Sequence, residues 1–224
     1  MDEAFSRRDV IRTVGGAGLA AVFGVRALQL LGEDAEAATT CLLTPEATEG
    51  PYWVDGALSR RNVTEGKAGV PLVIRFTVLN AKTCKPIRNA DVEIWHCDAF
   101  GTYSGVNGAT TRFLRGHQRS NALGKAEFLT LFPGWYPGRT PHIHMKVSVG
   151  GNEVHTGQVF FNEKVTTVVY KQAPYRSRGQ YDTPHASDGI YSQAGGSRAE
   201  LKLTRRSGGL RGYVGTIAVG VVPS

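Results

Sequence analysis

The signatures of several common enzyme and nucleotide-binding classes are missing from this sequence of 224 residues. It has no Gly-x-Ser-x-Gly motif of the serine hydrolases, no phosphate-binding Walker loop and no Gly-x-Gly-x-x-Gly motif of the dinucleotide-binding proteins. It also has no internal repeat and no low-complexity linker. These absences argue against a serine hydrolase, a P-loop protein and a dinucleotide-dependent dehydrogenase.

Cysteine is scarce, with only Cys41, Cys84 and Cys97 in the whole sequence. Their spacing does not fit a zinc site or an iron–sulfur cluster. In an exported protein we expect one pair to form a disulfide and to leave one thiol. Three pairings are possible, and the sequence does not choose between them.

Basic residues outnumber acidic ones: the sequence has 26 Lys and Arg residues and 19 Asp and Glu residues, which gives a formal net charge of +7. The basic residues are scattered along the chain and no nucleic-acid-binding motif accompanies them. We therefore expect no nucleic-acid partner and interpret the charge as a basic surface that favours solubility. Attraction to anionic aromatic or polymeric substrates is the alternative.

Residues 1–38 are interpreted as a twin-arginine signal peptide. Residues 6–11 read Ser-Arg-Arg-Asp-Val-Ile, which matches the twin-arginine pattern, and residues 35–37 read Ala-Glu-Ala, which matches a cleavage site. The apolar run 14–31 is broken by Arg26 and is too short to span a membrane. We predict a secreted protein without a membrane anchor after cleavage, exported in its folded form. A chance Arg-Arg pair before an amphipathic helix is the alternative.

Residues 39–224 are expected to form one all-β catalytic domain, a β-sandwich with long active-site loops. Short apolar segments with strand-like alternation are bounded by turn residues, and there is no strong amphipathic helix. Strands are predicted at 71–80, 90–96, 125–132, 142–149, 155–161, 200–203 and 212–222. Loops are predicted at 42–62, 100–121 and 180–196, and 165–175 is compatible with a short helix or a strand.

The stretch 133–146 carries the strongest chemical signal in the sequence. It reads Pro-Gly-Trp-Tyr-Pro-Gly-Arg-Thr-Pro-His-Ile-His-Met-Lys. His142 and His144 are two residues apart in a predicted strand, so both side chains lie on one face and can bind one metal ion. Tyr136 lies in a loop between two Pro-Gly turn signals and can reach the same ion. A lone His-x-His is common by chance, so the interpretation depends on the accompanying tyrosines.

A second tyrosine, Tyr103, lies in a glycine-bounded loop just after the predicted strand 90–96. With it, the candidate metal ligands are two imidazoles and two phenols. Imidazole alone suits zinc, copper or iron. Free tyrosine ionises only near pH ~10, so a phenolate site at neutral pH needs a strongly charged cation. The ligand set therefore predicts ferric iron, Fe(3+).

Further short motifs surround these residues: Thr44-Pro45-Glu46, Glu49-Gly50-Pro51-Tyr52, Trp95-His96-Cys97-Asp98-Ala99 and Thr156-Gly157-Gln158. Together with Tyr103, Arg139 and the His-x-His pair, they resemble the intradiol ring-cleaving dioxygenases. These are non-haem ferric enzymes that open catechols between the two hydroxyls, and their core is a β-sandwich. The resemblance covers about residues 41–162 and is loose afterwards.

The resemblance implies a role for each candidate residue. Tyr103 and His142 would be equatorial iron ligands, and Tyr136 and His144 axial ones, with hydroxide in the fifth place. Tyr136 would leave the iron and take a substrate proton.

Arg139 would stabilise negative charge that develops on the substrate, since preorganised charge is usually the largest catalytic term. Gln158 would line the pocket, and Tyr52 would lie on the substrate side. The simpler interpretations are a surface arginine, an amide on an edge strand and a packed aromatic ring.

The resemblance predicts an oxidoreductase of aromatic catabolism that inserts both atoms of O2 into a catechol-type diol and gives a cis,cis-muconate-type diacid. One alternative is an exported, non-catalytic β-sandwich that binds aromatic or polysaccharide material. Another is an extradiol enzyme, which needs ferrous iron on two His and one carboxylate. No Asp or Glu lies at a matching position for it.

Catechol-cleaving relatives carry an N-terminal helical dimerisation segment, and between residues 38 and 71 there is no helical periodicity. The chain looks more like the exported members related to protocatechuate dioxygenases. The sequence therefore specifies neither the oligomeric state nor the particular catechol.

Overall fold

The computed structural model describes residues 41–206 and 211–223. The predicted signal peptide, residues 1–38, lies outside the described residues, so export stays a prediction. None of the helices in the described part of the chain has the length and apolar character needed to cross a lipid bilayer.

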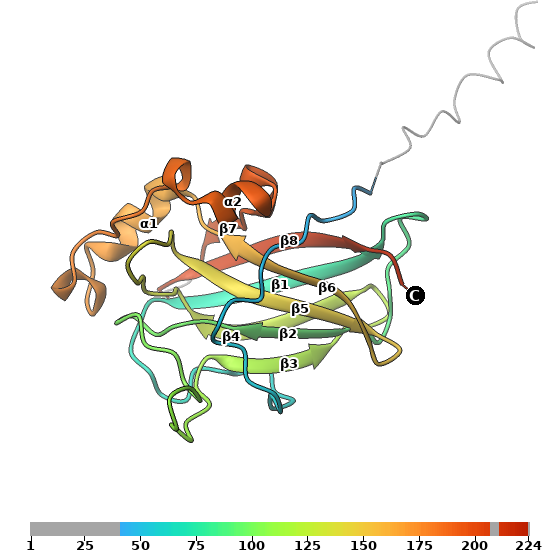
Figure 1. Ribbon diagram of the computed structural model, residues 1–224, viewed down its shortest axis with the longest axis horizontal. Coiled ribbons are helices and arrows are strands. Elements are labelled where there is room, and N and C mark those ends of the chain that lie inside the picture. Colours follow the sequence, from blue (N-terminus) through green and yellow to red (C-terminus); the bar gives the residue numbers. More distant parts are fainter. Residues whose placement is uncertain (1–40, 207–210, 224) are drawn as a thin grey trace, which may run out of the picture. The chain divides into compact units, whose positions relative to one another are not determined.

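In the described residues, two four-stranded sheets pack face to face (Figure 1). The first has the order β4 (Lys125–Leu131), β1 (Pro71–Asn80), β8 (Tyr213–Val221) and β7 (Lys202–Arg205). The second has the order β3 (Arg115–Arg119), β2 (Asp91–Trp95), β5 (His142–Val149) and β6 (Asn152–Phe160). β1 and β8 run parallel, and the other neighbouring strands run antiparallel. The predicted all-β sandwich is confirmed.

Alternation along the strands builds the core between the sheets. In β1, Ile74 and Phe76 are fully buried, whereas Arg75 between them points to solvent and pairs with Glu127. In β5 the odd-numbered residues Ile143, Met145 and Val147 belong to the same core. Since successive side chains of a strand point to opposite faces, the even-numbered residues of β5 lie on the outer face of its sheet. The two histidines of the sequence motif are therefore directed away from the core.

The irregular segment 41–64 covers that outer face. Figure 1 shows it crossing β6 and β5, and hydrogen bonds fix the crossing: Ala47 N–H donates to the Thr156 carbonyl at 3.1 Å. Lys146 Nζ of β5 forms an ion pair with Glu49 at 2.5 Å. At its start a disulfide joins Cys41 to Cys84, which selects one of the three possible pairings. Cys97 is left as a buried thiol.

Two sequence predictions need correction. Residues 100–121 were expected to be loop throughout, but 115–119 form β3, whose Arg-Gly-His-Gln-Arg sequence has no apolar alternation. The strand is held by its backbone pairing with β2 and by a bridge to Ser59, so side-chain hydrophobicity carries no signal of it.

The expected loop 180–196 contains a 3-10 turn, His185–Ser187, and the short helix α2, Gly189–Gln193. The segment 165–175 was compatible with a helix or a strand. Its first part, residues 165–170, belongs to the helix α1, Glu163–Tyr170. Both helices start at an N-cap side chain, Asn162 for α1 and Asp188 for α2. A five-residue helix is too short to show a hydrophobic period, which explains why the pattern missed it.

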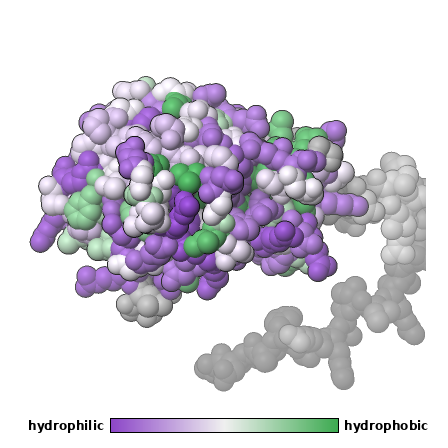
Figure 2. Space-filling view, turned by 60° about the horizontal axis from the view of Figure 1, so that its bottom comes forward, coloured by the Kyte–Doolittle hydropathy of each residue, from purple (hydrophilic) through white to green (hydrophobic). Residues whose placement is uncertain are grey.

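The surface shown in Figure 2 is largely hydrophilic, with small separate apolar areas. Large apolar side chains exposed among the described residues are Leu42, Leu43, Leu58, Phe100, Leu123 and Val168. Apart from the adjacent Leu42 and Leu43, they come from separate parts of the chain, and single exposed apolar side chains are common on folded proteins.

Candidate metal and catalytic site

The structure brings all four predicted ligands together. Tyr136 Oη lies 2.9 Å from His142 Nε2, and His142 Nε2 lies 3.1 Å from His144 Nε2. His144 Nε2 in turn lies 3.1 Å from Tyr103 Oη. The two histidines come from β5, Tyr103 from the loop after β2 and Tyr136 from the loop after β4. Two nitrogen and two oxygen atoms from three parts of the chain thus converge on one point.

The imidazole of His144 is fixed by its neighbours. Trp95 of β2 pairs with His144 across the sheet, and the two rings stack with centroids 5.0 Å apart and planes 8° apart. Gly50 of the covering segment has a φ of +75°, and a Cβ added there would lie 3.1 Å from His144 Cε1. Glycine is thus required at position 50 both for the backbone turn and for the close approach to the ring.

The imidazole of His142 is oriented by a hydrogen bond. His142 Nδ1–H donates to the Thr140 carbonyl at 2.7 Å, which leaves the Nε2 lone pair directed at the other candidate ligands. Metal-binding histidines are usually held in this way. His144 differs, since its buried Nδ1 has no hydrogen-bond partner among the described residues. Its orientation depends on the contacts with Trp95 and Gly50.

Burial sets the protonation states of the four side chains. It lowers the pKa of His142 to about 3, with help from the Arg139 charge, and lowers the pKa of His144 well below its usual value. Both imidazoles are therefore neutral at pH 7, as metal ligands must be. Burial also raises the pKa of Tyr136 to about 12 and that of Tyr103 well above its ordinary value. Phenolates at this position consequently require a strongly charged cation beside them.

The side chains fit ferric iron by their chemistry. Two imidazole nitrogens and two phenol oxygens converge, and Fe(III) has the charge needed to ionise phenols. Among the described residues, no group of three or more His, Cys, Asp or Glu side chains is placed to hold a metal. The two-histidine, one-carboxylate set of an extradiol enzyme is thus not found in this part of the chain.

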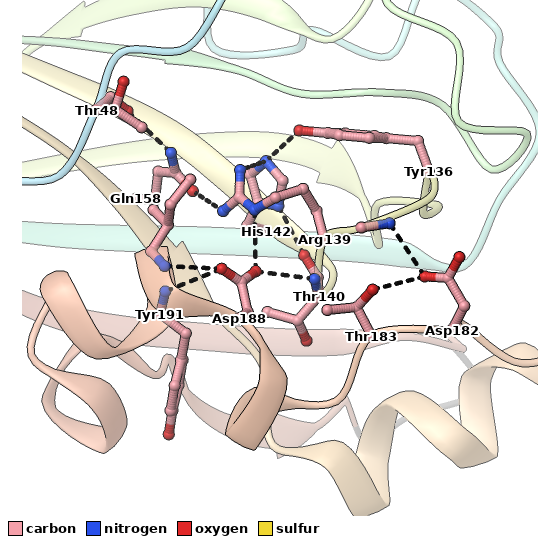
Figure 3. A network of polar contacts seen from close by, with 12 residues as sticks. Thr48, Tyr136, Arg139, Thr140, His142, Gln158, Asp182, Thr183, Asp188 and Tyr191 are labelled. Atoms are coloured by element: carbon pink, nitrogen blue, oxygen red, sulfur yellow. Dashed lines mark hydrogen bonds and ion pairs between the residues drawn. The ribbon is translucent and has the colours of Figure 1, made fainter.

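Arg139 and Gln158 belong to the same site (Figure 3). Arg139 Nη2–H donates to Gln158 Oε1 at 2.6 Å, and Arg139 Nη1 lies 3.5 Å from His142 Nε2. Gln158 Nε2–H donates to the Thr48 carbonyl at 2.9 Å. The Arg139 side chain is only 14% exposed and Gln158 is buried. Arg139 is therefore not an exposed surface arginine. Gln158 is more than an edge-strand amide, because it also binds the Arg139 guanidinium.

Tyr52 forms part of the wall around the two tyrosines. Its ring stacks on Tyr103 with centroids 4.3 Å apart and meets Tyr136 edge-on at 5.8 Å. The same aromatic cluster contains Trp95 and Cys97. Tyr52 therefore packs against the candidate ligands and not in the core between the sheets. Its predicted contact with substrate stays a prediction.

Sequence reasoning missed Asp188. Its carboxylate accepts hydrogen bonds from Arg139 Nε at 3.0 Å and from Thr140 N at 3.0 Å, and it caps α2. Asp188 lies 49 residues after Arg139, in the part of the chain where the resemblance is loose. The one available sequence signal was an Asp at a helix start, which predicts a cap but no contact with a distant arginine.

The fold is that of a β-sandwich protein, and two histidines and two tyrosines form a candidate metal site on it. A family model described as Dioxygenase matches residues 48–171, more than half of the chain. The solved intradiol ring-cleavage dioxygenase from Tetranychus urticae is 34% identical, covers 82% of this chain and 96% of that chain, and superposes with a TM-score of 0.77. This chain belongs to the intradiol ring-cleavage dioxygenase family.

Two further relatives extend the comparison. Catechol 1,2-dioxygenase 1 of Acinetobacter lwoffii is 30% identical over 185 residues, which cover 71% of this chain and 57% of that protein. The chain thus spans little more than half the length of this curated relative. The dioxygenase domain of a dioxygenase carbohydrate-binding protein fusion from Streptomyces sp. SirexAA-E is 29% identical, with a TM-score of 0.60, and covers 82% of this chain and all of that domain.

Proposed function

We propose that this protein is an Fe(III)-dependent intradiol dioxygenase. It would use O2 to cleave a catechol-type diol between its hydroxyls and give a cis,cis-muconate-type diacid. The proposal rests on one observation. Each ring nitrogen or phenol oxygen in the series Tyr136, His142, His144 and Tyr103 lies within 3.1 Å of the next, and the Arg139 guanidinium lies beside them. The names of the catechol 1,2-dioxygenase relatives support a catechol-type substrate.

Tyr103, Tyr136, His142 and His144 would hold the iron. When bound, ferric iron supplies the charge that keeps phenol and catechol oxygens ionised and the electron-accepting centre through which the ring becomes reactive toward O2. The protein contributes two neutral imidazoles that are already aligned, because β5 places them on one face.

The two tyrosines would act differently when a catechol binds. A catechol that binds through both oxygens must release two protons. The ionised Tyr136 Oη would accept one of them, and hydroxide would accept the other. Tyr136 lies half-buried in the loop between Pro133 and Gly138, whereas Tyr103 is buried beneath the Tyr52 ring. We therefore assign proton acceptance to Tyr136 and a fixed position to Tyr103.

Arg139 would supply a fixed positive charge toward the reacting ring. Its guanidinium lies beside His142 Nε2, in a site from which most water is excluded, so its charge is screened less than at the surface. Preorganised charge of this kind needs no reorganisation during the reaction. Gln158 keeps the guanidinium plane in place through its Oε1.

The decisive experiment combines metal analysis, oxygen uptake and product analysis on the protein purified with its native metal. We expect about one ferric ion per chain, a visible tyrosinate charge-transfer band, and O2 consumption with at least one catechol in a panel of ring-substituted diols. Zinc or copper at full occupancy with no iron would contradict the metal assignment. Binding of aromatic or polysaccharide material without O2 uptake would instead favour the non-catalytic alternative.

A further inference from the structure

The loop that carries Arg139 is anchored by a carboxylate from a distant part of the chain (Figure 3). Asp188 Oδ2 accepts hydrogen bonds from Arg139 Nε and from Thr140 N, both at 3.0 Å. Its other oxygen, Oδ1, accepts from Ile190 N at 2.9 Å and Tyr191 N at 3.3 Å at the start of α2. The side chain is 1% exposed. One buried carboxylate thus receives four N–H donors, two from the site loop and two from the helix.

These contacts determine where the positive charge of Arg139 lies. Its Nε is bound by Asp188 and its Nη2 by Gln158, and the remaining Nη1 lies beside His142 Nε2. Because a guanidinium is planar and rigid, two hydrogen bonds on its fork fix the direction of the third nitrogen. A buried arginine without the carboxylate would also be an uncompensated charge. Asp188 therefore supplies both the geometry and the charge balance that keep Arg139 in the site.

We propose that Asp188 is a positioning residue for the dioxygenase reaction, which directs the Arg139 guanidinium at the face of the metal-ligand set where the substrate binds. The inference rests on the proposed function. The inference adds to the proposed function a residue that lies outside the family match, which ends at residue 171. Asp188 acts through Arg139 and does not itself touch the reacting atoms.

The ionised carboxylate is required for this arrangement. Burial alone would raise the pKa of Asp188, but the hydrogen bond from Thr140 and the charge of Arg139 hold it below its ordinary value. An asparagine at position 188 has one acceptor oxygen and one amide group that only donates. It can therefore serve either the α2 backbone or the Arg139 loop, but not both. If it keeps the helix cap, its amide N–H groups face the N–H groups of Arg139 and Thr140.

Asp182 provides a matched control. It accepts a hydrogen bond from Gly138 N at 3.3 Å in the same loop, but it is exposed and makes no contact with Arg139. Asp182→Asn changes the same chemical group in the same segment. We expect it to leave the catechol kcat close to that of the wild type.

The kinetic test measures kcat and KM of the iron-loaded enzyme with its best catechol. Asp188→Asn should lower kcat by about 10²-fold, the loss expected when a charged group is displaced by about 1 Å. Iron content and the charge-transfer band should stay unchanged, since Arg139 is not a ligand. Asp188→Ser keeps a helix-capping oxygen but cannot reach Arg139, and it should show the same loss. It replaces Asp188→Asn if that variant does not fold.

A double-mutant cycle distinguishes positioning from general structural support. Arg139→Gln alone should lower kcat, and adding Asp188→Asn to it should cause no further loss, because the group that Asp188 positions is already gone. An equal additional loss in the Arg139→Gln background would overturn the inference. Wild-type kcat in Asp188→Asn and Asp188→Ser would overturn it as well.

A crystal structure of the Asp188 variant gives a readout that does not depend on activity. The Arg139 guanidinium should leave Gln158 Oε1 in Asp188→Asn or Asp188→Ser and should keep this hydrogen bond in Asp182→Asn. An unmoved guanidinium would refute the positioning role even if the kinetic parameters change. If the wild type consumes no O2 with any catechol, the proposed function fails, and these structures still decide whether Asp188 positions Arg139.

Discussion

Tyr103 and Tyr136 contribute the same chemical group to one site, but their surroundings differ. Tyr103 is 6% exposed, lies under the stacked ring of Tyr52, and approaches an imidazole that Trp95 and Gly50 hold in place. Tyr136 is half-buried in a Pro-Gly loop and approaches His142. Each half joins a β5 histidine to a loop tyrosine. In the first, the packed half, the tyrosine is buried under an aromatic ring, and in the second, the loop half, the tyrosine is partly exposed. We expect the packed half to hold the metal and the loop half to respond to the substrate.

The largest expected effect comes from Tyr103→Phe. It removes the tyrosine ligand that is proposed to stay on the iron throughout the reaction, so iron retention should weaken and the charge-transfer band of the substrate complex should fade. Elemental analysis and the visible spectrum measure this. Tyr52→Phe is the control, because it keeps the stacked ring and should keep the iron. Full iron and unchanged colour in Tyr103→Phe would contradict the comparison.

Tyr136→Phe should affect substrate binding more than iron binding. Three protein ligands remain, but the proton acceptor is gone, and positioned proton transfer is typically worth about 10²- to 10⁴-fold. We expect a loss in that range in the rate at which the catechol complex forms, with ring opening still observed afterwards. Stopped-flow absorption resolves the two steps. If Tyr136→Phe bleaches the substrate complex while Tyr103→Phe retains its colour, the two roles are exchanged.

Alanine substitutions at two glycines, Gly50 in the packed half and Gly138 in the loop half, test the comparison without changing a candidate ligand. Ala at position 50 needs a positive φ and places a Cβ 3.1 Å from His144 Cε1, whereas Ala at position 138 needs a similar φ but meets no atom within 4 Å. Both should lower the free energy of unfolding by about 1–3 kcal/mol through backbone strain. Only Gly50→Ala should also reduce iron content, because it displaces His144. Urea denaturation and metal analysis separate the two effects, and equal iron in both variants would argue against a tightly packed half.

The smallest effect on the site is expected from replacing Arg7 and Arg8 by Lys. A receptor reads the twin-arginine pair, so secretion should stop while iron content and O2 uptake of the cytoplasmic protein stay unchanged. Cell fractionation with activity assays measures both. Continued secretion of the variant would contradict the signal-peptide assignment.

The sequence predicted the regular part of the molecule well. The observed bounds of β1 and β5 equal the predicted ranges 71–80 and 142–149. β1 is a short apolar run, β5 alternates between its two faces, and each is bounded by turn residues. β3 was missed because its sequence has almost no apolar side chains. The four candidate ligands could be selected from the sequence because two lie on one face of a predicted strand and two lie in loops bounded by Gly or Pro, and the structure brings the four side chains together.

The contacts that surround the ligands were not predictable in the same way. The pairing of Cys41 with Cys84 depends on the path of segment 41–64 across the sheets, which no local pattern specifies. The contact of Asp188 with Arg139 joins residues 49 positions apart, in segments that both lack a period. Local patterns specify strands and turns, whereas the supporting shell of the site depends on tertiary packing.

The covering segment has a consequence for the order of folding. Its contacts join residues far apart in the chain: Glu49 with Lys146 at a separation of 97, Thr48 with Gln158 at 110, and Thr44 with Gly220 at 176. Closing such long loops costs entropy before any contact rewards it, so these contacts form slowly. Strands β5 and β6 must already be paired to receive the segment. We therefore expect the two histidines to be solvent-accessible in a late folding intermediate and to become enclosed only when residues 44–53 dock.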